Sequence, residues 1–148
     1  MKTPQQIQSI EISTIAHSTE DLGKVEAALS HLLPDSLRGR QLFTRSYVEG
    51  HYNNPIVTFT ARITKPSEIA QITGFLMNQL PKSDRLLIQR NLSLHSDGEG
   101  NLFLRVDKQQ ALRGTITLSD VDPIRVKLKF SRFGGRVTDL MINYLESS

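Results

Sequence analysis

The sequence contains no cysteine and no long apolar run, and each absence removes several classes of protein. Without cysteine among its 148 residues, the chain has no disulfide scaffold, no thiolate metal site and no thiol nucleophile. No stretch of about 18 apolar residues is present, so no membrane span is expected. The segment from Met1 to Gln8 is polar and lacks the apolar core of a signal peptide. Together these features are typical of a cytoplasmic protein, and we expect that location.

The motifs of common enzymes are missing as well. The sequence has no glycine-rich phosphate loop, no HxxxH pair, no GxSxG motif and no carboxylate cluster for two metals. An acid–base pair made of His17 and His51 would need tertiary proximity. We therefore expect no catalysis, no metal and no cofactor. A small hydrolase or nuclease, with a pocket that gathers His17, His51, Asp107 and Lys108, is a third hypothesis.

What the chain does contain is the composition of a globular protein, with 38% hydrophobic and 22% charged residues. Its length suits one domain that buries roughly two thirds of its unfolded surface. No linker or repeat divides the chain, so residues 1–148 are expected to form a single domain.

Apolar periodicity predicts both kinds of element. Alternation of apolar and polar residues predicts strands at 7–17, 41–48, 56–63, 102–107, 114–119 and 123–131. Helices are expected after Ser18 or Thr19, from Pro66, after Ser83 and after Gly135. The predicted fold class is α+β, with a mostly antiparallel sheet of about five or six strands and helices packed on one face.

Positive charge is concentrated in the segments predicted as strands. Residues 38–65 carry five cations and one acid, and residues 101–136 carry eight cations and three acids. In the last predicted strand Arg125, Lys127 and Lys129 alternate with apolar residues, and Arg132 follows. Such a row can neutralise the phosphates of a nucleic-acid backbone. The alternative is a solvated strand whose lysines prevent edge pairing.

Three polar segments stand at the ends of predicted elements. His17, Thr19, Glu20 and Asp21 lie at a helix start, whose free amides can bind phosphate, although a helix capped by its own acids is the simpler interpretation. In the turn of residues 50–55, His51 and Tyr52 offer stacking surfaces, and Asn53 and Asn54 tolerate unusual backbone angles. A hairpin turn whose aromatic packs onto the sheet is equally compatible.

The third segment is Arg105-Val106-Asp107-Lys108-Gln109. Arg105 and Asp107 would share one strand face and could pair with each other, while Lys108 and Gln109 lead into the next turn. Lysine beside aspartate also occurs in phosphoryl-transfer sites, which is the basis of the enzyme hypothesis.

Taken in order, these segments resemble those of an archaeal family of RNA-binding proteins described as predicted exosome subunits. The matching segments are His17–Asp21, Gly50–Ile56, Arg105–Gln109 and Asp122–Arg125. Ser18 stands where the family usually has alanine and Asn53 where it usually has glycine, and the likeness fades after Phe130.

The resemblance implies a fold similar to the ribosomal protein that grips the small rRNA of the large subunit. It also implies a non-catalytic RNA-binding role, with RNA and exosome or other RNA-processing proteins as partners. The candidate RNA contacts are His51, Tyr52, Asn53, Asn54, Arg105, Lys108, Gln109, Arg125, Lys127, Lys129 and Arg132. A protein–protein adaptor in an RNA-processing assembly is the second hypothesis, and it predicts an exposed apolar patch.

Overall fold

Five strands form one antiparallel sheet in the computed structural model, which describes residues 7–49, 55–131 and 136–146. The strands follow the order β2-β3-β1-β5-β4 across the sheet. Their bounds are β1 Ile7–Ala16, β2 Thr44–Glu49, β3 Pro55–Ile63, β4 Asn101–Val106 and β5 Ile124–Phe130. The predicted α+β class with an antiparallel sheet is confirmed.

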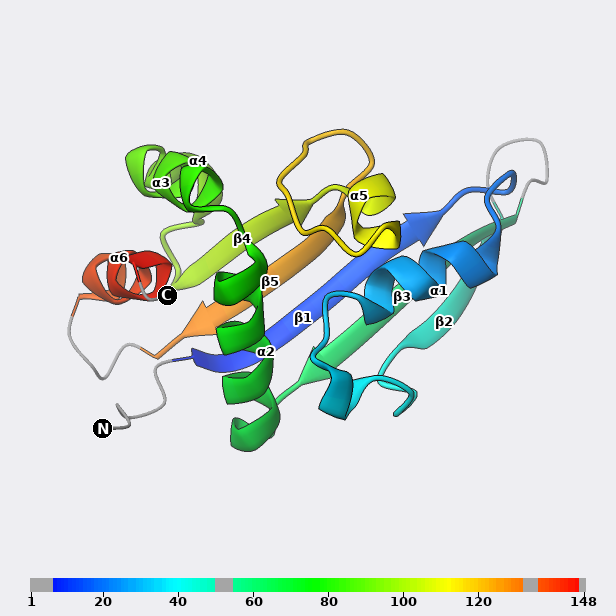
Figure 1. Cartoon of the computed structure of the whole chain (residues 1–148), viewed down its shortest axis with the longest axis horizontal. Coiled ribbons are helices and arrows are strands. Elements are labelled where there is room, and N and C mark those ends of the chain that lie inside the picture. Colours follow the sequence, from blue (N-terminus) through cyan, green and yellow to red (C-terminus); the bar gives the residue numbers. More distant parts are fainter. Residues whose placement is uncertain (1–6, 50–54, 132–135, 147–148) are drawn as a thin grey trace.

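The helices connect the strands and lie mainly over one face of the sheet (Figure 1). Their bounds are α1 Leu22–Ser30, η1 Asp35–Leu37 (a short 3-10 helix), α2 Pro66–Gln79, α3 Lys82–Arg90, α4 Leu92–His95, α5 Lys108–Leu112 and α6 Val137–Glu146. Helices α1, α2 and α5 lie across the sheet, while α3 and α6 lie near each other at one end (Figure 1). None of the helices in the described ranges is long and apolar enough to cross a membrane.

The core fills the space between the sheet and its helices because every second strand residue points that way. In β1, Ile10 and Ile12 are fully buried, and in β5 the same holds for Val126 and Leu128. Strand β1 pairs with β3 on one side and with β5 on the other. Burial of one such side chain stabilises the fold by roughly 1.5–3 kcal/mol, so the central strand anchors the whole layer.

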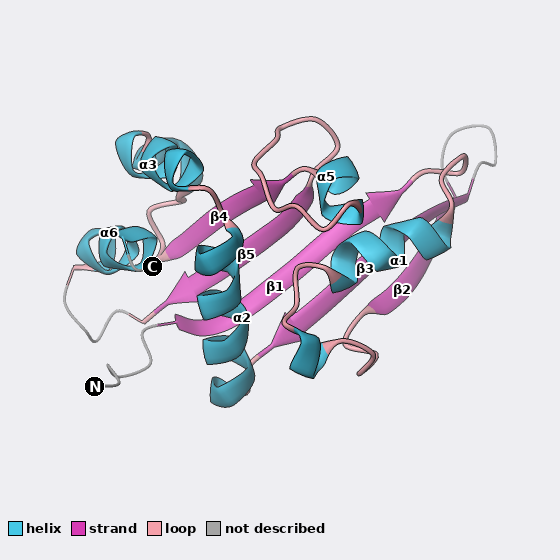
Figure 2. Cartoon of the chain, viewed as in Figure 1, coloured by secondary structure: helices cyan, strands magenta, loops and turns pink. Residues whose placement is uncertain are grey.

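The opposite face of the sheet is not covered by any helix of the described ranges (Figure 2). Along β3, Thr60 and Arg62 are exposed while their neighbours Phe59 and Ala61 are buried. We call this uncovered side the open face. Its side chains are therefore available to solvent and to a ligand.

One predicted strand and two predicted caps are wrong. Residues 114–119 form no strand, because the chain turns back after α5 at Gly114, whose φ of 83° suits glycine, and Leu118 makes only an isolated bridge. Asp21, and not Ser18 or Thr19, caps α1, and its carboxylate accepts the Gly23 amide at 2.8 Å. Helix α3 follows Pro81 and begins before Ser83.

Candidate nucleic-acid interface

Basic side chains of three strands, β3, β4 and β5, lie on the open face. Strand register decides this, because residues that are directly opposite point to the same side of a sheet. Arg105 of β4 faces Arg125 of β5, and Lys127 faces both Phe103 of β4 and Glu11 of β1. The cations gathered on this face are Arg62, Arg105, Arg125, Lys127 and Lys129.

Only one acid stands among these five cations in the described strands. Glu11 lies between Arg62 and Lys127, and it forms an ion pair with Lys127 at 3.5 Å. No ion pair within the described ranges joins Arg62, Arg105, Arg125 or Lys129 to a carboxylate. Placing Arg105 directly opposite Arg125 brings like charges together, which is unfavourable in the free protein. A polyanion bound on this face would relieve that repulsion.

The open face also carries five small hydroxylated side chains, Ser13, Thr44, Ser46, Thr58 and Thr60. Two exposed apolar side chains, Ile15 and Val48, lie on the same face. The one aromatic side chain of the described open face, Phe103, is only partly exposed. Hydroxyls and guanidinium groups donate hydrogen bonds to phosphate and ribose oxygens, whereas unpaired bases need aromatic stacking surfaces. The described part of this face thus suits the nucleic-acid backbone better than splayed bases.

Next to this surface, Lys108 joins three of the polar segments from the sequence. Its side chain is buried, and Nζ donates to the Ile15 carbonyl oxygen at 2.8 Å, to Asp122 Oδ2 at 3.0 Å and to Glu20 Oε1 at 3.2 Å. Three acceptors match the three donors of an ammonium group. Lys108 therefore holds the end of β1, the start of α1 and the loop before β5 together.

His17 lies on the outside of this cluster. Its Nε2 is 3.4 Å from Asp122 Oδ1, and its backbone amide donates to Glu20 Oε1 at 3.0 Å. We call His17, Glu20, Lys108 and Asp122 the Lys108 cluster. Ligand atoms of His17, Glu20 and Asp122 are close enough to hold a metal ion. The Lys108 ammonium already binds both carboxylates and offsets one of their two negative charges.

The electrostatics of Asp122 reflect these contacts. Partial burial alone would raise the pKa of Asp122, but the hydrogen bond and charge of Lys108, with a smaller contribution from His17, outweigh it. The pKa of Asp122 is therefore held below its ordinary value of 3.8. Asp122 is ionised at neutral pH, as the ion pair with Lys108 requires.

A hollow of about 340 Å³ connects the cluster to the basic surface. Arg125 and Ser13 of the open face line one part of it, and Asp120 and Asp122 line another. Thr14, on the helix side of β1, fixes the neighbouring loop through a hydrogen bond from its hydroxyl to the Pro123 carbonyl oxygen at 3.2 Å. The Asp122–Arg125 segment thus belongs to both the cluster and the open face.

Several residues proposed from the sequence lie elsewhere than expected. Asp107 does not pair with Arg105; it caps α5 and accepts the Gln110 amide at 2.9 Å. Lys108 is only 4% exposed, so it positions its neighbours and offers no surface charge.

Thr19 and Gln109 are exposed. The proposed contacts His51, Tyr52, Asn53, Asn54 and Arg132 lie outside the described residues.

The sequence analysis missed two members of the open face. Arg62 and Phe103 were not singled out, although alternation in their strands would have indicated them. Val57, Phe59, Ala61 and Ile63 share the buried side of β3, which places Arg62 on the other side. What the sequence could not show is that β3 and β4 lie on either side of the β1–β5 pair.

Comparison with known proteins agrees with these features. The chain belongs to the family described as RNA binding, whose profile matches residues 9–130. RNA-binding protein PAB1135 of Pyrococcus abyssi is 33% identical over 128 residues, which is 84% of this chain and 83% of that protein. The uncharacterized protein MJ0213 of Methanocaldococcus jannaschii is 28% identical over 120 residues, 80% of either chain. The predicted relation to an archaeal RNA-binding family is confirmed.

Solved structures share the fold. Protein AF2318 of Archaeglobus fulgidus superposes with a TM-score of 0.81 at 31% identity, covering 94% of this chain and 99% of its own. Mth689 of Methanothermobacter thermautotrophicus, a DUF54 protein, gives a TM-score of 0.74 at 25% identity, covering 95% of this chain and 99% of its own.

Proposed function

We propose that this protein binds RNA through the open face of its sheet and does not catalyse a reaction. The observation that carries the proposal is the group of four cations without a carboxylate partner in the described ranges: Arg62, Arg105, Arg125 and Lys129. Phosphate groups of a bound nucleic acid would supply the negative charge that these four cations lack within the protein. Membership of a family described as RNA binding supports RNA as the polyanion.

The chemistry of the open face favours contacts to the RNA backbone. Guanidinium groups bind phosphate oxygens through paired donors, and serine and threonine hydroxyls reach phosphates or ribose 2′-hydroxyls. Such contacts orient the protein on RNA without reading its sequence. The candidate contacts Arg105, Arg125, Lys127 and Lys129 remain in this proposal, joined by Arg62. RNA contacts through Gln109, Arg132 and residues 51–54 stay predictions.

Salt dependence provides the test. Each phosphate contact contributes roughly 0.7–0.9 to the slope of log K against log salt concentration. Replacing Arg125 and Lys129 by glutamine should weaken binding to structured RNA and reduce that slope by about two. Fluorescence anisotropy at several salt concentrations measures both quantities.

The matched control replaces Lys24 of α1 and Arg90 of α3 by glutamine, because both are exposed and lie on helices. This variant loses the same net charge from another part of the molecule. If both double variants weaken binding equally, the effect comes from net charge, and the proposal for the open face is wrong.

A role as an adaptor has one observation in its favour. Leu86 and Leu87 of α3 and Leu94 of α4 are exposed apolar side chains, Leu94 at 72%. Such a patch suits a protein partner in an RNA-processing assembly, among which the exosome is suggested by the family resemblance. Co-purification with and without Leu94→Ser tests this second function separately from RNA binding.

A further inference from the structure

We propose that the outer edge of β2 pairs with β2 of a second copy of this chain, in antiparallel register about a two-fold axis at Tyr47. All six residues of β2 are exposed, with Tyr47 at 66% and Val48 at 54%. Proteins usually protect an edge strand with charged side chains, especially lysine, or with proline, a bulge or a covering segment. Thr44–Glu49 contains neither lysine nor proline, its two charges, Arg45 and Glu49, are of opposite sign, and its six residue pairs with β3 run without a register shift.

The other edge of the sheet is closed by its own chain. Outside β4, the Asp97 amide bonds the Asn101 carbonyl oxygen at 3.3 Å, the Asp107 amide bonds Thr117 at 2.8 Å and the Ser119 amide bonds Arg105 at 2.9 Å. Isolated bridges Ser96–Leu102 and Val106–Leu118 lie along the same edge. Among the described strands, β2 therefore has the free edge, and pairing through it stops at two copies.

Symmetry restricts the register. Two antiparallel copies of one strand are related by an axis perpendicular to the sheet, so each side chain faces a side chain of the same sheet face. Arg45 and Tyr47 lie on the helix-covered face, because their partners in β3 are the buried Phe59 and Val57. Glu49 follows on the same face by alternation.

Charge then favours one register. An axis at Arg45 or at Glu49 would place a charge opposite its own copy. An axis at Tyr47 places Arg45 of each copy opposite Glu49 of the other, which creates two ion pairs, with the two tyrosine rings side by side at the centre. Ser46 and Val48 then face each other on the open face.

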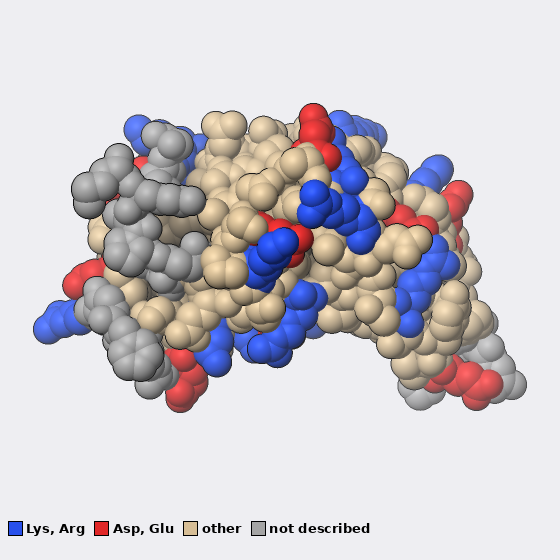
Figure 3. Space-filling model, turned by 90° about the horizontal axis from the view of Figure 1, so that it is seen from below, with Lys and Arg blue, Asp and Glu red and all other residues tan. Residues whose placement is uncertain are grey.

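The basic character of residues 38–65 does not oppose this contact. Arg38 pairs with Asp35 at 2.7 Å, Arg40 pairs with Glu68 at 3.6 Å, and Arg45 pairs with Glu26 of α1. In the view from below, Lys and Arg side chains are accordingly interspersed with acidic ones (Figure 3). The hydrogen bond with Glu26 raises the pKa of Arg45 further, so Arg45 keeps its charge and has donors left for a second carboxylate.

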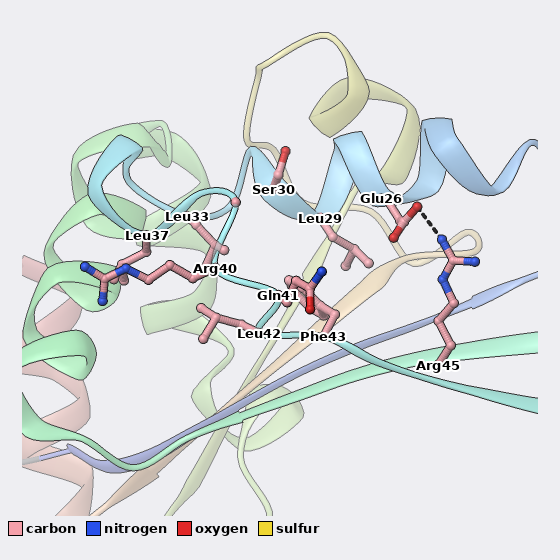
Figure 4. Close-up of a pocket in the computed structure, with 11 residues that line it drawn as sticks. Glu26, Leu29, Ser30, Leu33, Leu37, Arg40, Gln41, Leu42, Phe43 and Arg45 are labelled. Carbon is pink, nitrogen blue, oxygen red and sulfur yellow. Dashed lines mark ion pairs between the residues drawn. The ribbon is translucent and has the colours of Figure 1, made fainter.

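The helix-covered side of the sheet is hollowed near the start of β2. A hollow of about 450 Å³ lies between α1 and the segment that enters β2, with Leu29, Leu33 and Phe43 among its lining residues (Figure 4). Arg45 points across its rim toward Glu26 (Figure 4). The pairing would join the two sheets into one of ten strands, with both open faces on the same side.

Sedimentation velocity without RNA tests the proposal. Wild-type protein should shift toward twice the chain mass as its concentration rises. Tyr47→Lys and Tyr47→Glu should each lose the dimer, because the residue on the axis faces its own copy. An equimolar mixture of the two variants should regain it, since lysine then faces glutamate. The control Val121→Lys changes a side chain that is 81% exposed outside the sheet, and it should leave the dimer intact.

Circular dichroism spectra that match the wild-type spectrum show that the variants are folded. A wild-type protein that stays monomeric at the highest concentration would overturn the proposal, and so would a mixture that stays monomeric. Because no RNA is present, these outcomes are independent of RNA binding.

Discussion

At the scale of single residues, Lys108 illustrates how a lysine in a polar segment can serve the fold. Its ammonium lies among the Ile15 carbonyl oxygen and the carboxylates of Glu20 and Asp122. A buried charge of this kind contributes little net stability relative to an apolar replacement of the whole cluster, but removing one partner alone is costly. The cluster therefore couples three chain segments tightly.

The first prediction follows from that coupling. Lys108→Met keeps most of the side-chain volume but leaves Glu20 and Asp122 without their counter-charge. We expect a loss of about 3 kcal/mol in the free energy of unfolding, measured by urea denaturation. Lys24→Met, at an exposed site on α1, should change that free energy by no more than about 0.5 kcal/mol. Equal effects of the two substitutions would show that Lys108 has no special structural role.

The second prediction concerns pH. The pKa of Asp122 is lowered in the folded protein from an ordinary value of 3.8, so its ionised form is the one that the fold stabilises. That stabilisation is fully present above pH 3.8 and is lost as the pH falls through the lower folded value. The difference in unfolding free energy between wild type and Asp122→Asn should therefore shrink below pH 3.8.

The control for this pH effect is Asp120→Asn, which changes an exposed carboxylate in the same loop. Its difference from wild type should stay small at every pH. If the difference in unfolding free energy between wild type and Asp122→Asn stays constant from neutral to acidic pH, ionised Asp122 does not stabilise the fold.

At the scale of elements, α5 is a five-residue helix that depends on its cap. Helices this short are marginal by themselves, so the hydrogen bond from the Gln110 amide to Asp107 Oδ1 adds to the packing that holds α5 in place. Ala111 of α5 is fully buried and fixes the helix against the core.

The third prediction is that Asp107→Ala lowers the free energy of unfolding by about 1 kcal/mol, because one amide of α5 loses its partner. Thermal or urea denaturation measures the change. Asp107→Asn, which retains an acceptor oxygen, should recover most of the loss. If the asparagine variant is as unstable as the alanine variant, capping does not explain the role of Asp107.

At the scale of the whole molecule, the open face presents charge and hydroxyl groups over a continuous sheet surface. The fourth prediction is that structured or duplex RNA binds at least as tightly as an unpaired strand of equal length, because the described face contacts backbone and offers little stacking surface. Competition anisotropy with RNAs of several sequences measures this preference. A strong preference for one unpaired sequence would instead indicate base stacking, for which Tyr52 is the predicted residue.

Much of the fold followed from the sequence because local patterns decide it. Alternation located β1, β3, β4 and β5, and the spacing of apolar residues located α2 and α6. The predicted strand at 114–119 failed because its alternation resembles that of a strand, while the positive φ of Gly114 after α5 turns the chain away from the sheet.

The tertiary structure alone determines which residues form the open face and the Lys108 cluster. The order β2-β3-β1-β5-β4 and the register of its pairs bring Arg62, Arg125 and Arg105 onto one face, because residues far apart in sequence meet there through strand pairing. The same pairing encloses Lys108 and leaves the edge of β2 free. Sequence thus determined which residues form strands and helices and where the charges lie along them. Which charges share a surface and which are buried together depends on long-range pairing, which local periodicity does not encode.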